Sequence, residues 1–128
     1  MMRLLLDTHA LIWHFEKNES LGRRAKTIIG DSKSHVFVSV ASLWEMAIKN
    51  SLGKIRFGHT LREIYLDYIA AGADILPVSP EHAMAVEGLP WHHRDPFDRM
   101  LIAQAMTENL TLVTRDAQFD RYDVRIIW

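Results

Sequence analysis

The feature that most constrains the fold is a set of short apolar runs, almost unbroken by polar residues, that recur along the chain. They lie at residues 4–6, 36–38, 75–78, 110–113 and 124–127. A strand with one face in water alternates apolar and polar residues, whereas a near-continuous run is typical of a strand covered on both faces, as in parallel sheets. The five runs therefore predict a mostly parallel sheet of about five strands.

Segments with helical spacing separate these runs. The expected helices span 10–16, 21–29, 41–52, 61–71, 80–87 and 97–108. Gly53 and Gly72 come just after two of them, where a helix C-cap is expected. Strands that alternate with helices imply right-handed crossovers and a layered α/β fold. With 128 residues and no linker, repeat or low-complexity segment, we expect a single domain over 1–128.

Composition narrows the classes of function. The chain has no cysteine, which excludes disulfides, thiolate metal sites and cysteine nucleophiles. No apolar run approaches the roughly 20 residues that span a bilayer, and the N-terminal residues lack the pattern of a signal peptide, so we expect a soluble, cytoplasmic protein. The formal net charge of -1 neither favours nor opposes a nucleic-acid partner.

Acidic residues occur where parallel sheets form their ligand sites, which is beyond the carboxyl ends of the strands. Asp7 directly follows the first run, in RLLLDTH, and Asp116 lies three residues past Val113. Glu45 and Asp98 each share a helical face with apolar residues, and Asp98 lies in the first turn of its helix, where the dipole favours an anion. We therefore expect four carboxylates at one edge of the sheet.

Such a cluster predicts a metal ion. Crowded carboxylates raise one another's pKa unless a cation neutralises them, and hard divalent ions such as Mg²⁺ or Mn²⁺ prefer oxygen ligands. Mg²⁺ held by a few carboxylates keeps several waters, so it can activate one as a nucleophile and stabilise charge on a phosphoryl group. We expect Mg²⁺, with Mn²⁺ as the alternative.

Each acid also has a structural interpretation when taken alone. Asp7 and Asp116 suit helix N-caps. The stretch 95–98 has the pattern of a capping box, with proline at the first helical position and an acid at the third. Glu45 is spaced to pair with Lys49 one turn later on a solvated face.

Five further side chains are candidates for contact with a substrate. Arg99 and Arg115 each adjoin one of the acids, and Lys49 lies one helical turn from another, so these cations are expected to line a phosphate path. His92 and His93 are adjacent in WHHRD, and adjacent histidines rarely face one ion. We interpret them as loop or substrate-facing residues.

Four segments resemble, in order, the acidic motifs of PIN-domain ribonucleases, and most closely the VapC-type toxins of bacterial toxin-antitoxin pairs. They are LLLDTHALIW at the N-terminus, VSVASLWEMAIKNSLGKI around Glu45, HRDPFDRMLIAQA around Asp98 and LTLVTRD at Asp116, and they span nearly the whole chain. The resemblance implies a three-layer α/β/α fold. It also implies that Asp7, Glu45, Asp98 and Asp116 are catalytic, metal-binding acids.

The same resemblance implies a reaction and partners. It indicates a Mg²⁺- or Mn²⁺-dependent endoribonuclease, usually a homodimer, in which metal-bound water attacks an RNA phosphodiester in line. A cognate antitoxin is expected to fill the acidic groove, and the complex contacts DNA only through that antitoxin. Thr114 matches the family's supporting hydroxyl residue, and Asp95 is expected either to join the site or to cap the helix.

Two other classes of protein stay open at this point. Receiver-like or haloacid-dehalogenase-like phosphoryl-transfer domains also carry aspartate at strand ends. They need a second acid close to the first and a later lysine, but Asp7-Thr8-His9 lacks that acid and no lysine follows Lys54. The other class is a non-catalytic PIN-like binding module, and the presence of all four acids argues against it.

Overall fold

The sheet has the five strands that the apolar runs predict. The computed structural model describes residues 1–53 and 58–128, so Lys54 and the end of the second motif lie outside the described residues. The strands are β1 (Arg3–Leu6), β2 (His35–Ser39), β3 (Asp74–Leu76), β4 (Thr111–Val113) and β5 (Ile126–Ile127). They form one sheet in the order β3-β2-β1-β4-β5, and all four pairings are parallel.

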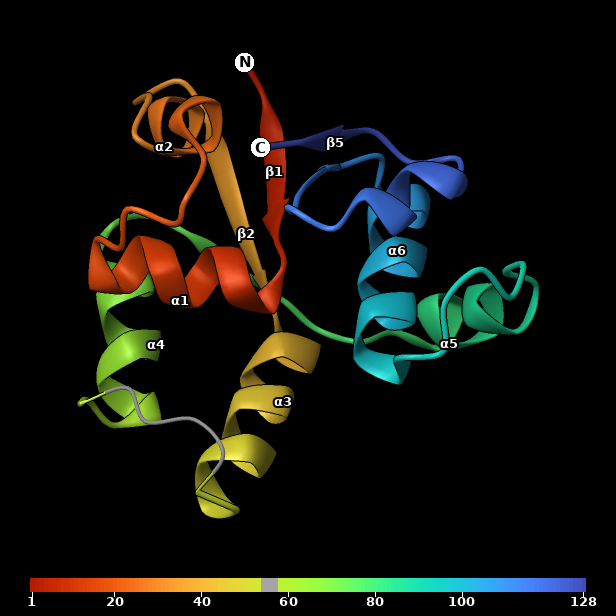
Figure 1. The fold of residues 1–128 in the computed structure, drawn as a ribbon, viewed down its shortest axis with the longest axis horizontal. Helices are drawn as coiled ribbons and strands as arrows, with labels where there is room; N and C mark the ends of the chain where they lie inside the picture. Colours follow the sequence, from red (N-terminus) through yellow and green to blue (C-terminus); the bar gives the residue numbers. More distant parts are fainter. Residues whose placement is uncertain (54–57) are drawn as a thin grey trace.

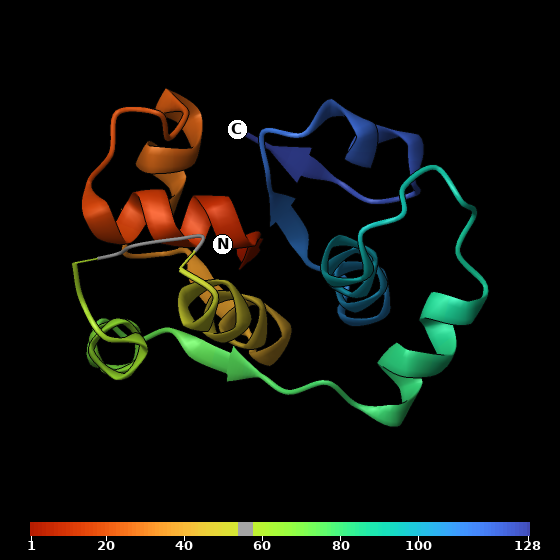
Figure 2. The same ribbon diagram turned by 60° about the horizontal axis from the view of Figure 1, so that its bottom comes forward.

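Helices cover both faces of this sheet. They are α1 (Thr8–Glu16), α2 (Arg23–Ile29), α3 (Val40–Ser51), α4 (Leu61–Ala70), α5 (Pro80–Glu87) and α6 (Pro96–Glu108). Helices α1, α2 and α4 lie on one side and α5 and α6 on the other, while α3 continues from the end of β2 (Figures 1 and 2). The three-layer prediction is confirmed. The short 3₁₀ helix η1 (Ala117–Arg121) was not predicted. No helix of the described residues is long and apolar enough to cross a membrane.

The three leucines of β1 explain why its sequence is continuously apolar. Leu4 and Leu6 point into the core under α1, α2 and α4, whereas Leu5 points into the core under α6. All three are fully buried. Because successive side chains of a strand face opposite sides, only a strand covered on both faces needs apolar residues at every position.

Two helix ends follow the glycine signal in the sequence. Gly53 has φ +70° and Gly72 has φ +91°, and each comes directly after the C-cap residue of its helix. Left-handed backbone of this kind carries little cost for glycine, which has no Cβ. The predicted ends of α3 and α4 are therefore confirmed.

The chain connectivity fixes where a ligand site belongs. The strand order reverses at β1, which has β2 on one side and β4 on the other. Parallel sheets form their ligand crevice beyond the carboxyl ends of the strands at such a point. The Asp7 N–H extends the β1–β4 ladder by donating to the Val113 carbonyl at 3.0 Å. Residues that follow β1 and β4 therefore lie side by side.

Candidate active site

Asp7 stands at the carboxyl end of β1 with its side chain almost fully buried. Its Oδ1 accepts a 2.8 Å hydrogen bond from the Ala10 N–H, so Asp7 is the N-cap of α1. Burial raises the pKa of the Asp7 carboxyl, while the Ala10 N–H and the Thr114 hydroxyl oppose that rise. The structural interpretation as a cap is therefore correct, but it leaves a buried acid whose ionised form is destabilised.

Glu45 projects from α3 and is only 4% exposed. Its Oε1 accepts a 2.6 Å hydrogen bond from the Thr8 hydroxyl, and its Oε2 accepts one of 2.6 Å from Lys49 Nζ. The predicted pair with Lys49 exists, but on a buried face instead of a solvated one. Lys49 was also predicted to contact substrate, and in this structure its ammonium bonds to Glu45.

Asp95 and Asp98 lie at the start of α6, where the sequence indicated a capping box. Asp95 is the N-cap: its Oδ1 accepts from the N–H groups of Phe97 and Asp98 at 2.9 and 3.0 Å. The reciprocal bond of a capping box would join the Asp95 N–H to the Asp98 carboxylate. That N–H donates instead to His93 Nδ1. The Asp98 carboxylate is therefore not used in capping.

The pKa of the Asp98 carboxyl is raised by its surroundings, which include the other acids. Burial raises it most, and the negative charges of Asp95, Glu45, Asp7 and Asp116 raise it further, to about 8. These carboxylates come from the ends of β1 and β4 and from helices α3 and α6. Of the four predicted acids, Asp98 and Asp116 come within 4.8 Å of each other among the described residues, and Asp7 and Glu45 lie close enough to act on the charge of Asp98.

Thr114 and Asp116 follow β4, the strand next to β1. The buried Thr114 hydroxyl accepts a 3.1 Å hydrogen bond from the Asp116 N–H, and it also helps to keep Asp7 ionised. Asp116 Oδ1 accepts a 2.9 Å bond from the Gln118 N–H and caps η1. Thr114 thus lies between two of the acids, where the resemblance puts a supporting hydroxyl.

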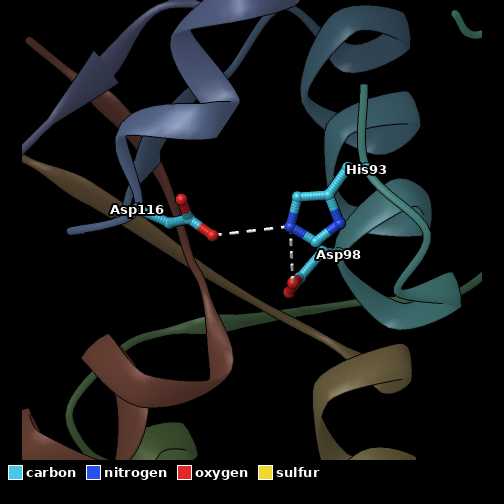
Figure 3. Close-up of side chains that lie close together, drawn as sticks. All are labelled: His93, Asp98 and Asp116. Atoms are coloured by element: carbon cyan, nitrogen blue, oxygen red, sulfur yellow. Dashed lines mark hydrogen bonds and ion pairs between the residues drawn. The ribbon is translucent and has the colours of Figure 1, made fainter. Parts of the chain in front are cut away.

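His93 was predicted to be a loop or substrate-facing residue, and its contact with the acids was not predicted. Its Nε2 lies 3.2 Å from Asp98 Oδ2 and 3.4 Å from Asp116 Oδ2, so one ring nitrogen faces both carboxylates (Figure 3). The neighbouring His92 instead packs edge-on against Tyr122, with ring centres 5.1 Å apart. The only signal in the sequence is that adjacent side chains on extended backbone point in opposite directions, so one of two histidines near a helix start faces inward.

The prediction that Arg99 contacts substrate is wrong. Arg99 is 2% exposed, and its guanidinium lies 3.8 Å from the centre of the Trp91 ring. It donates hydrogen bonds to the carbonyls of Val86, Leu89, Pro90 and His93. Neighbouring residues on a helix point about 100° apart, so Arg99 faces the loop when Asp98 faces the acid cluster.

Arg115, by contrast, is exposed beside the acids. Its guanidinium lies 5.0 Å from the centre of the Trp13 ring. Together with His9, these side chains and the acids Asp7 and Asp116 line a cleft of about 310 Å³. The cleft places a cation and an aromatic face next to the carboxylates.

The residues present suit a hard divalent cation. Carboxylate oxygens dominate the donors, and one carboxylate oxygen from each of Asp98 and Asp116 and one ring nitrogen of His93 lie within 4.8 Å of one another. Among the described residues, Lys49 bonds to Glu45 of the cluster, yet the pKa of Asp98 stays well above its usual value. A divalent ion would supply the missing positive charge.

Comparison with known protein families decides the classification. The family model of the PIN domain matches residues 4–125. The chain belongs to the PIN-domain family. The match includes all four predicted acids, and it confirms the family resemblance that the motifs indicated. It also argues against the receiver-like and haloacid-dehalogenase-like classifications.

Solved structures with the same fold come from toxin-antitoxin systems. This PIN domain matches a chain of VapBC2 from Rickettsia felis, bound to a DNA fragment from their promoter, at TM-score 0.69 and 17% identity over 98% of both chains. It matches FitAcB from Neisseria gonorrhoeae at TM-score 0.67 and 18% identity, over 98% of this chain and 96% of the other.

A third match is VapC20 from Mycobacterium tuberculosis, described as a Sarcin-Ricin loop cleaving toxin. Its TM-score is 0.66 and its identity 15%, over 92% of this chain and 93% of the other. At such identities the likeness shows a shared fold. A comparison with curated protein sequences found no match.

Proposed function

We propose that this PIN domain is a metal-dependent endoribonuclease that acts as the toxin of a toxin-antitoxin pair. The observation that carries the proposal is the convergence of four carboxylates beyond the ends of β1 and β4, with the pKa of Asp98 raised to about 8. A fold without such a site has no use for buried acids that repel one another. The non-catalytic alternative leaves this cost unexplained.

Asp7, Glu45, Asp98 and Asp116 are the residues that would hold Mg²⁺ or Mn²⁺, with Asp95 close by. The bound ion would lower the pKa of a water and offset negative charge on the phosphodiester. The chain's own contribution is to fix the acids. Strand β1 and the cap of α1 hold Asp7, Thr8 and Lys49 hold Glu45, and the hydroxyl of Thr114 supports Asp7.

The cleft beside the acids suits a single RNA strand. The exposed Arg115 is placed to contact a phosphate, and Trp13 and His9 offer ring faces on which bases stack. Lys49 would neutralise charge at the site through Glu45. This arrangement supports RNA as the substrate.

A cognate antitoxin is the proposed regulatory partner in the cytoplasm, and DNA is contacted only through it. Two structures of similar fold are DNA-bound complexes: VapBC2 of Rickettsia felis and VapBC of Salmonella typhimurium. The Salmonella chain has 20% identity and TM-score 0.66, over 99% of this chain and 98% of its own. By analogy, this chain would join such a complex through its antitoxin.

A second copy of the chain is the other proposed partner. An apolar hollow of about 540 Å³ includes Trp44, which is 63% exposed, and Trp91, which is 75% exposed. Contiguous exposed apolar patches that include large side chains often mark protein contacts. The hollow adjoins the starts of α3 and α6, so a dimer formed here would set two acid clusters near one another. The mass in solution of the protein and of Trp44→Arg tests this assignment.

The experiment that tests the function is cleavage of total cellular RNA by the purified protein, freed of antitoxin, with and without Mg²⁺ or Mn²⁺. We expect metal-dependent cuts at a few sites that disappear in Asp7→Asn while the folded circular dichroism spectrum is retained. Asp123→Asn, which removes the same charge from an exposed position, is the matched control and is expected to cleave normally. Wild-type cleavage by Asp7→Asn would contradict the proposal.

A further inference from the structure

His93 is the side chain in the acid cluster to which the proposed reaction gives no role. It comes from the loop between α5 and α6, and its side chain is 10% exposed. Its Nε2 stands 3.2 Å from one oxygen of Asp98 and 3.4 Å from one oxygen of Asp116 (Figure 3). These two acids come from different elements, α6 and the segment after β4.

The other ring nitrogen fixes the tautomer. Nδ1 of His93 accepts a 3.3 Å hydrogen bond from the Asp95 N–H. A nitrogen that accepts carries no proton, so Nε2 carries one and is a donor. The His93 ring also packs edge-on against Phe119, with centres 5.4 Å apart, which holds its plane. The Nε2–H group is therefore directed at Asp116 Oδ2, which accepts its hydrogen bond, while Asp98 Oδ2 lies 3.2 Å from the same nitrogen.

The backbone of His93 is anchored as well. Arg99 is buried, and one of its N–H groups lies 3.4 Å from the His93 carbonyl. The same guanidinium also donates to the loop carbonyls of Leu89 and Pro90 and to the Val86 carbonyl near the end of α5. Arg99 and Asp95 belong to the first turn of α6 and its cap, so the helix that carries Asp98 also fixes the histidine that contacts it.

We infer that His93 is a positioning residue, which fixes the Asp98 and Asp116 carboxylates through its Nε2–H and does not itself bind the metal ion. The inference rests on the proposed metal site. A protonated Nε2 has no free lone pair to ligate an ion, whereas its N–H group can hold the side chains of Asp98 and Asp116 in place before the ion arrives. Groups that orient metal ligands in this way typically change metal affinity about 10- to 100-fold when removed.

Adjacent His92 offers a matched control. Its ring packs against Tyr122 and lies outside the group formed by His93, Asp98 and Asp116. Substituting it changes the same loop and removes the same kind of ring. A general disturbance of the loop would affect both variants, whereas a role at the acids is confined to His93.

The test is the affinity for Mn²⁺, measured by titration calorimetry on the wild type, His93→Leu, His93→Gln and His92→Leu. We expect His93→Leu to bind Mn²⁺ about 10- to 100-fold more weakly. His93→Gln keeps a side-chain N–H and is expected to recover most of the affinity, and His92→Leu to match the wild type. Pulsed electron paramagnetic resonance of the wild-type Mn²⁺ complex is expected to show no directly bound imidazole nitrogen.

Three results would overturn the inference. They are wild-type affinity in His93→Leu, equal losses in the Leu and Gln variants, and a nitrogen coupling typical of direct coordination. If His93→Leu does not fold, the Gln variant and the resonance spectrum still decide between positioning and ligation. A wild-type protein that binds no Mn²⁺ would instead contradict the proposed function, so the two failures are distinguishable.

Discussion

Two buried histidines at opposite ends of α6 make nearly the same hydrogen bonds in different surroundings. His82 accepts at Nδ1 from the Ser79 N–H at 3.0 Å and faces one oxygen of Glu108 at Nε2, also at 3.0 Å. His93 accepts from a backbone N–H in the same way, but it faces two acids of the cluster. Both rings accept a backbone N–H at Nδ1, and His82 Nδ1 also lies 3.4 Å from Gln104 Nε2. The larger difference is the number of negative charges near Nε2.

That difference separates a structural contact from a functional one. Glu108 is partly exposed to water and has a histidine of its own. Asp98, at the other end of the helix, is half-buried, and its partial burial together with the negative charges of four further carboxylates raises its pKa to about 8. His82 faces a single carboxylate, that of Glu108. His93 faces a cluster of carboxylates, so negative charge stays in excess around Asp98. The hydrogen bonds of a histidine therefore do not identify the site. The excess negative charge around Asp98 identifies it.

The largest expected effect is on cleavage. Asp98→Asn removes a ligand of the proposed metal site and should lower the RNA cleavage rate by at least about 100-fold. Glu108→Gln makes the matching change at the other end of α6 and should leave the rate within about twofold, because no cluster surrounds Glu108. Initial rates on one RNA substrate give the measurement. Equal losses of cleavage rate in Asp98→Asn and Glu108→Gln would contradict the functional difference between the two ends of α6.

Arg99 should matter most for stability. Its replacement by methionine leaves buried loop carbonyls without a hydrogen-bond donor, so we expect the free energy of unfolding to fall by about 2 to 4 kcal/mol. The exposed Arg115→Met should leave stability nearly unchanged and weaken RNA binding. Urea denaturation and binding of a short RNA separate these outcomes. Unchanged stability of Arg99→Met would contradict the structural role assigned to it.

His82, the histidine assigned a structural role, should affect stability and not metal binding. His82→Leu should lower the free energy of unfolding by about 1 to 3 kcal/mol, because the Ser79 N–H and Glu108 lose a partner. Its Mn²⁺ affinity should equal that of the wild type. Thermal denaturation and calorimetric titration of the same sample give both quantities. Weakened Mn²⁺ binding would show that the two histidines are not separate in function.

A smaller effect is expected in the pH dependence of stability without metal. The folded Asp98 carboxyl has a pKa of about 8 against an ordinary value of 3.8, so between these pH values the folded state keeps a proton that the unfolded state has lost. The free energy of unfolding should therefore fall as pH rises through this window. Added Mg²⁺ and Asp98→Asn should both reduce the slope, and Glu108→Gln should not. A free energy of unfolding that rises with pH in this window would contradict the raised pKa of Asp98.

Much of the fold could be predicted because local rules govern it. The leucines of β1 are apolar at every position, and that pattern occurs when both faces of a strand are covered. Asp7 follows this strand directly, so its place at the sheet edge followed from the strand itself. η1 escaped prediction because five residues carry too little periodicity to recognise.

The side chains that depend on tertiary packing could not be predicted. Asp98 fits a capping box by sequence, but the N–H that would complete the box bonds to His93 instead. Arg99 adjoins Asp98 in sequence, and the helical turn between them directs it into the loop. Which of two adjacent histidines faces the acids depends on how the loop packs, and that packing is set by Arg99 itself.

The most direct test of the central claim is a crystal of the protein soaked in Mn²⁺, with anomalous scattering used to locate the ion. We predict an anomalous peak that places the ion against carboxylate oxygens of Asp7 and Asp98. His93 Nε2 is expected to face the acids and not to bind the ion. A peak elsewhere on the molecule, or none at an acid cluster free of antitoxin, would contradict the assignment of this edge of the sheet as a metal-dependent active site.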